Sequence, residues 1–445
     1  MAIEPVTDTD ERDPTALDAT PTAPSTSAPS TSAPATSAPA EPALTEPASA
    51  ELAPTEPVPA EPEPAVPVSE RLRRLLYLAA PSLVFLAVRL LGLLSLAWLA
   101  SAHRTRVLTK LTVWDGQWLL GIASGGYAGV PDGLTDAFGN RTPVTALAFF
   151  PGYPGVVAAV RFLAGTPLII AGLAVSLVAG LVMAHGLARL GEIVPGGSRN
   201  AGLLLVALVA AAPMGIVWSM TYSEGLFCAC AVWALVHVLS RNWLAAGCCT
   251  ALAGLVRPTG AALLLAVGLT LLAAAAKEPR DWRVWAGGLV APLGLVGYLG
   301  YVGWRTGSPM GWFTLQRDGW NSRFDLGAAT VSFTRDTLAG GRSVLEVVTV
   351  AVLAGSIVLL LVCIARGVPT PLVVFAAGVM VMDLGSNGLM NSKARLLLPA
   401  VTLFVPVAMA LAKRQRSTAL AVLAGVAVAS AWFGGYALTG WSYAI

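Results

Sequence analysis

Apolar runs dominate the chain from residue 71 onward, and their length constrains the fold more than any other feature. A helix needs about 20 mostly apolar residues to cross a hydrocarbon core of ~30 Å. By that measure we expect an all-α polytopic membrane protein, a bundle of about eleven transmembrane helices. The runs lie at residues 75–101, 167–188, 201–219, 222–240, 243–256, 261–276, 285–304, 344–366, 370–388, 396–412 and 417–436.

Composition agrees with a membrane protein. Charged residues make up only 12% of the chain, whereas soluble globular proteins carry about 25%. The mean hydropathy is +0.70. These values disfavour a water-soluble enzyme, a nucleic-acid-binding protein and a disulfide-stapled secreted module.

Residues 1–70 differ from the rest of the chain. They hold 13 of the 25 acidic residues, 15 of the 31 prolines and a single basic residue, Arg12. A segment rich in Pro, Ala, Ser and Thr cannot bury enough apolar area to offset the entropy of ordering its backbone. We therefore expect a disordered, acidic cytoplasmic tail over residues 1–70 and a membrane domain over residues 71–445. Because residues 1–70 show no charged segment followed by a short apolar one, we expect no cleavable signal peptide and expect the first apolar helix to act as the insertion signal.

Basic residues beside the runs predict the orientation, because short cytoplasmic loops carry an excess of Lys and Arg. Three arginines within residues 71–74 directly precede the first run and place the N-terminus in the cytoplasm. Two long loops, at about 102–166 and 305–343, then fall on the outer side. The first contains an apolar stretch at 144–163 that prolines interrupt, and we expect it to form short re-entrant or interfacial helices. The sequence thus predicts a multi-pass protein of the plasma membrane with its active site on the outer face.

Three carboxylates of the membrane domain are candidates for a catalytic role: Asp115, Glu224 and Asp383. Asp383 lies near the outer end of its run, where an ionisable group usually faces the bundle or a wet cavity, and a structural hydrogen bond is the alternative. Asp115 lies in WDGQW at 114–118, between two tryptophans whose rings suit both the headgroup level and the face of a sugar. A carboxylate held there could accept a proton from an acceptor hydroxyl. The alternative is an aromatic anchor at the membrane surface with an incidental acid. Glu224 ends the YSE motif at the outer start of a run, where an ordinary helix cap is the alternative.

Four basic residues are predicted to lie at membrane depth or in the outer half of the bundle. Arg89 is inside the first run, Arg257 interrupts an apolar hairpin, and Lys393 and Arg395 close a short outer loop. Cations at this depth are costly unless they meet an anion, and guanidinium forks match phosphate oxygens. We expect these four residues to bind the phosphate of a lipid headgroup. For Lys393 and Arg395, snorkelling of the side chain to the membrane surface is the alternative.

The sequence shows no sign of a metal or nucleotide site. The five cysteines lie inside apolar runs, and none has a histidine or carboxylate at metal-ligand spacing. A P-loop and a strand–GxGxxG–helix pattern are also missing. We therefore expect no metal site, no cofactor and no nucleic-acid partner.

Several motifs together resemble a known family, the PIG-V-type (GPI mannosyltransferase 2-like) bacterial integral membrane mannosyltransferases of the GT-C glycosyltransferase class. The matching motifs are WDGQW with a following GY at 114–127, FFPGYP at 149–154, YSEGLF at 222–227, GLVRPTG at 254–260 and RLLLPA at 395–400. They occur in order across most of the membrane domain, and the tail lies outside the resemblance.

The resemblance implies an inverting, metal-independent transfer of mannose from polyprenyl-phosphate-mannose to an acceptor hydroxyl at the outer face. It implies a single carboxylate in the first outer loop as the base, and by motif match this is Asp115. The implied partners are a lipid-linked sugar donor and a glycolipid or glycoprotein acceptor. We assign sugar or acceptor binding to residues of the motifs, namely Trp114, Gln117, Trp118, Tyr127, Tyr153, Tyr222 and Glu224.

Two other functions are compatible with these residues. A GT-C transferase that uses another polyprenyl-phosphate sugar, such as glucose or arabinose, would share the architecture. A transporter of lipid-linked sugars would also need intramembrane arginines and broken helices, but it should show an internal repeat of the span pattern, which we do not find. The sequence specifies neither the acceptor nor the oligomeric state.

Overall fold

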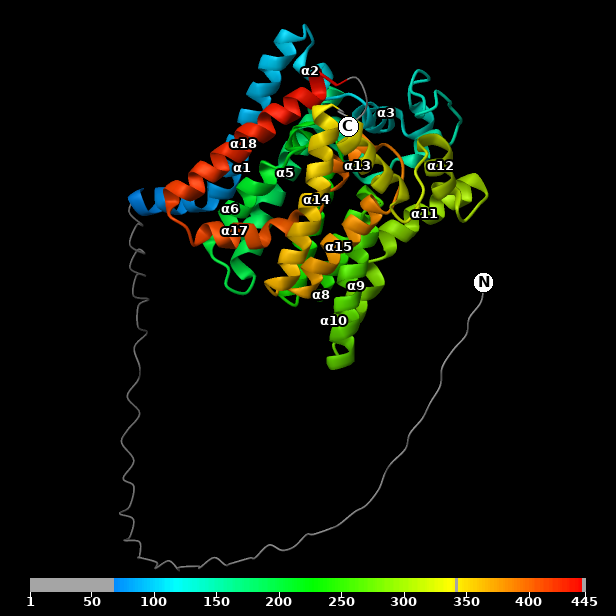
Figure 1. Cartoon of the computed structure of the whole chain (residues 1–445). Coiled ribbons are helices and arrows are strands. Elements are labelled where there is room, and N and C mark those ends of the chain that lie inside the picture. The colour runs from blue at the N-terminus through cyan, green and yellow to red at the C-terminus, as the bar shows by residue number, and fades with distance from the viewer. Residues whose placement is uncertain (1–67, 341–342, 442–445) are drawn as a thin grey trace, which may run out of the picture. The chain divides into compact units, whose positions relative to one another are not determined.

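The computed structural model describes residues 68–340 and 343–441, which form an all-helical domain without a β-strand (Figure 1). The α-helices are α1 (Val68–Ala102), α2 (Val107–Lys110), α3 (Asp115–Gly125), α4 (Gly152–Ala164), α5 (Leu168–Ile193), α6 (Arg199–Ala210), α7 (Glu224–Leu239), α8 (Trp243–Val256), α9 (Gly260–Lys277), α10 (Trp282–Val290), α11 (Leu293–Thr306), α12 (Gly311–Trp320), α13 (Ala328–Gly340), α14 (Val344–Ala365), α15 (Thr370–Leu384), α16 (Lys393–Leu396), α17 (Val405–Ala412) and α18 (Arg416–Thr439). Short 3₁₀ helices are η1 (Tyr127–Gly129), η2 (Thr145–Ala148), η3 (Gly215–Ser219), η4 (Met390–Ser392) and η5 (Val401–Phe404).

The helical domain begins slightly before the boundary expected from composition. Helix α1 starts at Val68, three residues before the predicted start of the membrane domain at residue 71. The remainder of the predicted tail, residues 1–67, lies outside the described residues.

Six segments are long and apolar enough to cross a membrane by themselves: Leu72–Ala102 of α1, α5, α9, Trp282–Thr306 formed by α10 and α11, α14, and α18. Met390–Leu396 and Val401–Ala412 form a pair bent by 65°, which makes a seventh span if it is counted as one. The other four predicted runs contain the shorter apolar helices α6, α7, α8 and α15. The predicted all-α polytopic fold is confirmed. Of the eleven predicted runs, six or seven form full-length spans among the described residues.

The shorter helices arise because the sequence breaks them within the apolar run. Helix α6 ends at Ala210, and Pro213 follows, whose ring disfavours the helical conformation in the residue before it. The chain continues through η3 to the start of α7, and nearly all of residues 211–223 are buried in protein. Non-helical backbone is tolerated at membrane depth under this condition, because neighbouring protein satisfies its polar groups.

Arg89 supplies hydrogen bonds to part of this non-helical backbone. Its side chain is 4% exposed, and its guanidinium donates hydrogen bonds to the carbonyls of Ala210 and Gly215. The Ala210 carbonyl lies in the last turn of α6, where carbonyls lack a helical partner, and Gly215 is the first residue of η3, so Arg89 links the two sides of the break. Arg89, which we predicted to bind donor phosphate, therefore lies at the break between α6 and η3.

We expect Arg89→Met to lower stability by about 2–4 kcal/mol, because two buried carbonyls would lose their donor. The measurement is the thermal unfolding midpoint of the purified protein in detergent. Arg161→Met is the matched control, since Arg161 is exposed on α4 and its loss should change stability by less than about 0.5 kcal/mol. Equal midpoints for the two variants would contradict the structural role of Arg89.

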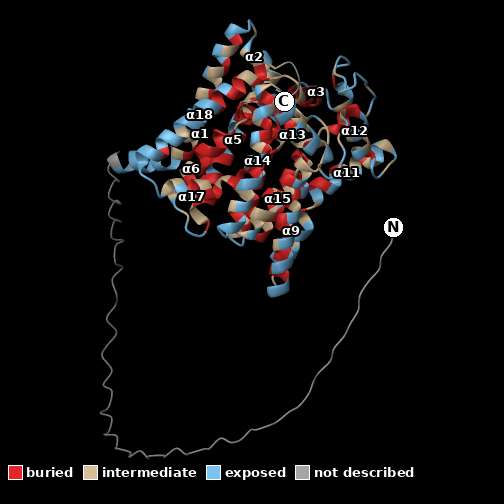
Figure 2. Ribbon diagram, viewed as in Figure 1, coloured by how far each residue is buried: buried red, intermediate tan, exposed pale blue. Residues whose placement is uncertain are grey.

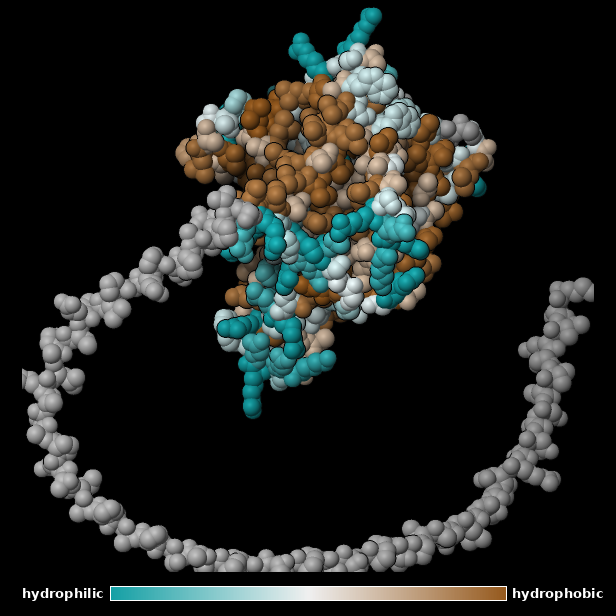
Figure 3. Space-filling view, turned by 90° about the vertical axis from the view of Figure 1, so that its left-hand side faces the viewer, coloured by the Kyte–Doolittle hydropathy of each residue, from teal (hydrophilic) through white to brown (hydrophobic). Residues whose placement is uncertain are grey.

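The two long loops form short helices at one end of the bundle. The first loop contains α2, α3, η1, η2 and α4, as predicted for interfacial helices, and the second contains α12 and α13. Figure 1 shows α2, α3, α12 and α13 gathered at the opposite end from the turn between α9 and α10. Figure 3 shows a broad apolar band on one face, with hydrophilic side chains gathered below it, as expected for a domain that crosses a membrane.

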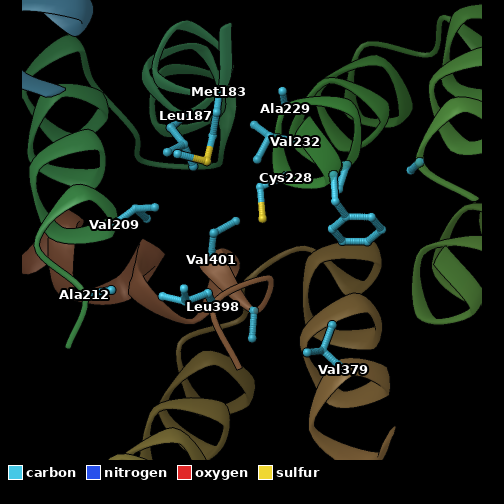
Figure 4. Close-up of a cluster of buried hydrophobic side chains, with 14 of the residues drawn as sticks. Met183, Leu187, Val209, Ala212, Cys228, Ala229, Val232, Val379, Leu398 and Val401 are labelled. Atoms are coloured by element: carbon cyan, nitrogen blue, oxygen red, sulfur yellow. The ribbon is translucent and has the colours of Figure 1, made fainter. Parts of the chain in front are cut away.

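The core lies where α5, α6 and α7 meet α15 and the chain after α16. In Figure 2 the buried residues follow the inner helices, whereas the start of α1 and the lower end of α9 are exposed. Figure 4 shows Met183, Val209, Cys228 and Val401 converging from four of these elements. Cys228 is a buried free thiol, whereas Cys248 is a free thiol on the exposed side of α8.

Candidate active site

The WDGQW motif forms the start of α3. Asp115 is the first residue of the helix, a position at which the helix dipole favours a carboxylate. Trp114 directly before it has φ +51°, a conformation that is uncommon for a residue other than glycine and is found at constrained sites. A side chain at Gly116 would place its Cβ 2.6 Å from Thr221 Oγ1. The glycine thus lets the first turn of α3 approach the YSE segment closely.

The YSE motif lies against α3 at the start of α7. The backbone N–H of Thr221 donates to the carbonyl of Leu111 at 3.0 Å, which ties this segment to the chain just before α3. Glu224 is the first residue of α7, and its side chain is 1% exposed. Two helix N-termini, each beginning with a carboxylate, therefore meet at one place.

Arg395 of α16 joins these two carboxylates. Its Nη1 donates to Asp115 Oδ2 at 2.7 Å, and its Nε lies 3.6 Å from Glu224 Oε1. The guanidinium also lies over the ring of Tyr222, 5.2 Å from its centroid. The sequence separation of Arg395 and Asp115 is 280 positions.

Arg257 completes the cluster from the end of α8. Pro258 favours an extended conformation for the residue before it, and Arg257 has φ −152° and ψ 151°. Its Nη1 lies 2.9 Å from Glu224 Oε1 and donates to Ser223 Oγ at 3.0 Å. The four charged residues Asp115, Glu224, Arg257 and Arg395 thus form one connected network, which we call the charged cluster.

The members of the charged cluster differ in access and in hydrogen bonding. The Asp115 side chain is 32% exposed, whereas those of Arg395 and Glu224 are 8% and 1% exposed. Both carboxylate oxygens of Glu224 and the Nε atoms of Arg257 and Arg395 make no hydrogen bond within the part of the chain that the structure describes. Buried polar atoms are nearly always hydrogen-bonded in proteins, so a cluster that leaves four of them without a hydrogen bond is suited to receive a polar ligand.

Lys393 lies apart from the charged cluster, although only two positions separate it from Arg395. Its Nζ donates to the carbonyls of Asp383 and Ser386, to the latter at 2.8 Å, and is 4.0 Å from Asp383 Oδ1. Residues two apart on a helix point to different sides, which is why Lys393 and Arg395 separate. The ammonium group is already bound by the end of α15, and the contact of Lys393 with donor phosphate stays a prediction.

We expect Lys393→Met to lower the unfolding midpoint, because the carbonyls at the end of α15 and the Asp383 carboxylate would lose their buried cation. The measurement is thermal unfolding in detergent, with the exposed Lys277→Met as the matched control. A variant with an unchanged midpoint and a raised donor KM would instead show that Lys393 binds phosphate directly.

Three of the seven predicted sugar-binding residues contact protein away from the charged cluster. Trp118 stacks on Phe149 with 5.3 Å between ring centroids. The Tyr127 hydroxyl donates to the Phe149 carbonyl at 2.9 Å, and the buried Tyr153 hydroxyl donates to the Gly172 carbonyl at 2.8 Å. Trp118 and Tyr127 thus hold the first long loop together, and Tyr153 ties it to α5. Four predicted residues lie at or beside the charged cluster: Glu224 within it, Tyr222 under Arg395, half-buried Trp114, and exposed Gln117.

Three residues that sequence reasoning did not single out shape the site. Ser223 accepts from Arg257 within the YSE motif. Trp320, at the end of α12, packs edge to face with Trp118, with 6.2 Å between the ring centroids. The Arg141 guanidinium lies 5.7 Å from the centroid of the Trp118 ring. Trp320 thus connects the second long loop to the first at Trp118, and Arg141 covers the same ring from within the first loop. The available signal was the concentration of aromatic residues and arginines in both loops.

Metal ligands do not gather in the described ranges 68–340 and 343–441, where no group of three or more His, Cys, Asp or Glu side chains is arranged to hold an ion. The charged residues of the candidate site are therefore the two carboxylates and two guanidinium groups of the charged cluster.

Comparison with family models and with curated proteins gives no match to this chain. Among solved structures, the chain is similar to ArnT from Cupriavidus metallidurans bound to undecaprenyl phosphate, with a TM-score of 0.48 and 16% identity over 78% of this chain. It is also similar to the apo state of the same protein, with a TM-score of 0.47 and 16% identity over 84% of this chain. The chain spans 63% of the length of the first structure and 78% of the second.

Proposed function

We propose that this chain is an integral membrane glycosyltransferase that moves a sugar from a polyprenyl-phosphate donor to a hydroxyl group of a lipid- or protein-linked acceptor. The observation that carries the proposal is the charged cluster, in which a partly exposed carboxylate lies against two buried guanidinium groups. Such a transfer needs a base for the attacking hydroxyl and cations for the departing phosphate. Both are present in one connected network.

Asp115 is the general base in this proposal. The acceptor oxygen forms a bond to the anomeric carbon while the bond from that carbon to the phosphate oxygen breaks. The hydroxyl proton passes to Asp115, and the electron pair of the broken bond leaves on the phosphate. Attack and departure on opposite faces of the sugar invert the anomeric carbon. Asp115 is the most exposed of the four charged side chains, so an acceptor can reach it.

Arg395 and Arg257 meet the negative charge that develops on the leaving phosphate. In the structure Arg395 is paired with Asp115, and a phosphate bound by Arg395 would draw the guanidinium from this pair and leave the carboxylate able to accept a proton. Glu224, almost fully buried between the two arginines, holds them in place. Guanidinium groups supply the required positive charge, so the proposed reaction uses no metal ion or cofactor.

Mannose is the proposed sugar, and the support for it is the set of motifs shared with the PIG-V-type family. The proposed orientation has the N-terminus in the cytoplasm and the charged cluster at the outer face. Its support is that the short loops with Lys277, Arg366 and Lys413 carry the basic residues, whereas α3 and α12 lie at the other end of the bundle (Figure 1). The long prenyl chain of the donor accounts for an enzyme built within the bilayer.

The test is sugar transfer by the purified full chain in detergent, with synthetic polyprenyl-phosphate-mannose and its glucose and arabinose counterparts as donors. Mass spectrometry then follows the release of polyprenyl phosphate and the glycosylated acceptor. We expect consumption of the mannose donor. Turnover of another donor alone would change the sugar and keep the reaction class. Movement of an intact lipid-linked sugar across proteoliposomes, without transfer, would contradict the proposal and favour a transporter.

A further inference from the structure

The first turns of α1 have a polar and an apolar stripe. Glu70, Arg73, Arg74 and Tyr77 share the spacing i, i+3, i+4, i+7, and Leu72, Leu75, Leu76 and Ala79 share the same spacing on another face. Every residue from 72 to 78 is exposed, with Leu75 at 63%. After Pro81 the same helix turns into a packed span, in which Phe85 and Leu96 are almost fully buried.

Pro81 and Arg199 separate these two parts of α1. Proline has no N–H, so the carbonyl of Tyr77 lacks its usual helical partner four residues on. Arg199 fills the gap, because its Nη2 donates to the Tyr77 carbonyl at 2.7 Å and its guanidinium lies 4.3 Å from the centre of the Tyr77 ring. Arg199 is itself held by Glu192 at 2.9 Å. The direction of the first turns is thus fixed by α5 and α6, and Figure 1 shows them running differently from the rest of α1.

The surroundings of these turns are basic. Helix α18 packs along α1, and the turn that leads into it carries Lys413, Arg414 and Arg416, all exposed. With Arg73 and Arg74 this makes five exposed cations, against the exposed Glu70. A helix with apolar residues on one face and arginines on the other lies in the interface of a bilayer, and anionic lipids strengthen its binding.

We propose that residues 72–80 are a membrane-surface anchor that binds the headgroup layer of anionic lipids. Leu72, Leu75 and Leu76 insert at the boundary of headgroups and acyl chains. Arg73 and Arg74 contact lipid phosphates. The hydrogen bond and ring contact of Arg199 with Tyr77 hold the segment parallel to the membrane surface. The anchor is independent of the proposed glycosyl transfer, because no residue of the charged cluster takes part in it.

The test is hydrogen–deuterium exchange of the full chain in nanodiscs that hold one copy each, made of neutral phosphatidylcholine alone or with phosphatidylglycerol. We expect the amides of residues 72–78 to exchange about tenfold more slowly in the anionic discs, since each arginine near an anionic surface adds favourable binding energy. About 0.5 M NaCl should weaken this protection by screening the charges. The double variant Arg73→Gln/Arg74→Gln should lose the response to phosphatidylglycerol, whereas the control Arg280→Gln/Arg283→Gln, also exposed, should keep it.

A second variant tests the apolar stripe. Leu75→Ser/Leu76→Ser should remove protection in both kinds of disc, because the arginines alone cannot hold the helix in the interface. Equal protection of the wild type in neutral and anionic discs would overturn the proposal. Protection that appears only in discs with two copies would also overturn it, because the apolar stripe would then contact a second copy of the chain. Full protection in detergent would overturn it too, because the stripe would then be covered by the protein itself.

Discussion

Replacing Asp115 with asparagine is expected to lower kcat for sugar transfer by about 100- to 10,000-fold, the range that a positioned general base contributes. The amide keeps the size of the side chain and can still accept a hydrogen bond from Arg395, but it cannot take the proton of the acceptor hydroxyl. The Asp115 side chain is 32% exposed, so losing its ion pair should cost little stability. The measurements are kcat and donor KM for transfer, beside the unfolding midpoint.

A matched control comes from the same loop. Asp132 is fully exposed and only loosely paired, 3.9 Å from Arg141, so Asp132→Asn should transfer sugar at the wild-type rate. If Asp115→Asn folds normally and retains full turnover, Asp115 is not the base. The search would then turn to Glu224 and Asp383, the other two acids that lie within the helical bundle.

The sequence predicts the helices well because burial in a bilayer demands long apolar runs, and each predicted run does contain a helix. It predicts full-length spans less well. The run at 201–219 is uniformly apolar, yet Pro213 ends α6 near the middle of it, and this break needs Arg89 from another helix to bind the carbonyls of Ala210 and Gly215. A contact of this kind depends on tertiary packing and is not visible in hydropathy.

For the candidate site, the sequence identifies residues but not how they pair. Asp115, Glu224, Arg257 and Arg395 were each singled out on motif or depth, but no spacing rule links positions as distant as Asp115 and Arg395. Lys393 and Arg395 were assigned to one phosphate on charge and depth, but residues two apart on a short helix point to different sides, and the structure gives the two side chains different protein partners. The sugar-binding role predicted for the aromatic residues is harder to judge from sequence. A tryptophan can stack on a sugar or on another aromatic ring, as Trp118 does on Phe149, and the residue type is the same in both cases.

Glu224 supports the second prediction, because it is the carboxylate that both buried arginines share. Glu224→Gln is expected to lower stability by about 3–5 kcal/mol, the cost of leaving buried charges without their partner, and to abolish measurable transfer as Arg257 and Arg395 lose their positions. Thermal unfolding in detergent measures the first effect, and the transfer assay measures the second in the fraction that remains folded.

We expect the loss of stability to depend on the burial of the ion pair and not on the distance between its charged atoms. A second ion pair in the chain, Arg241 with Glu278, allows the comparison. Arg241 and Glu278 lie 2.6 Å apart, closer than Arg257 and Glu224 at 2.9 Å, but their side chains are 62% and 45% exposed. Water screens such a pair, so Glu278→Gln should change stability by no more than about 1 kcal/mol. Similar losses in the two variants would show that water reaches the charged cluster freely, and Glu224 would then not be the residue that holds the arginines in place.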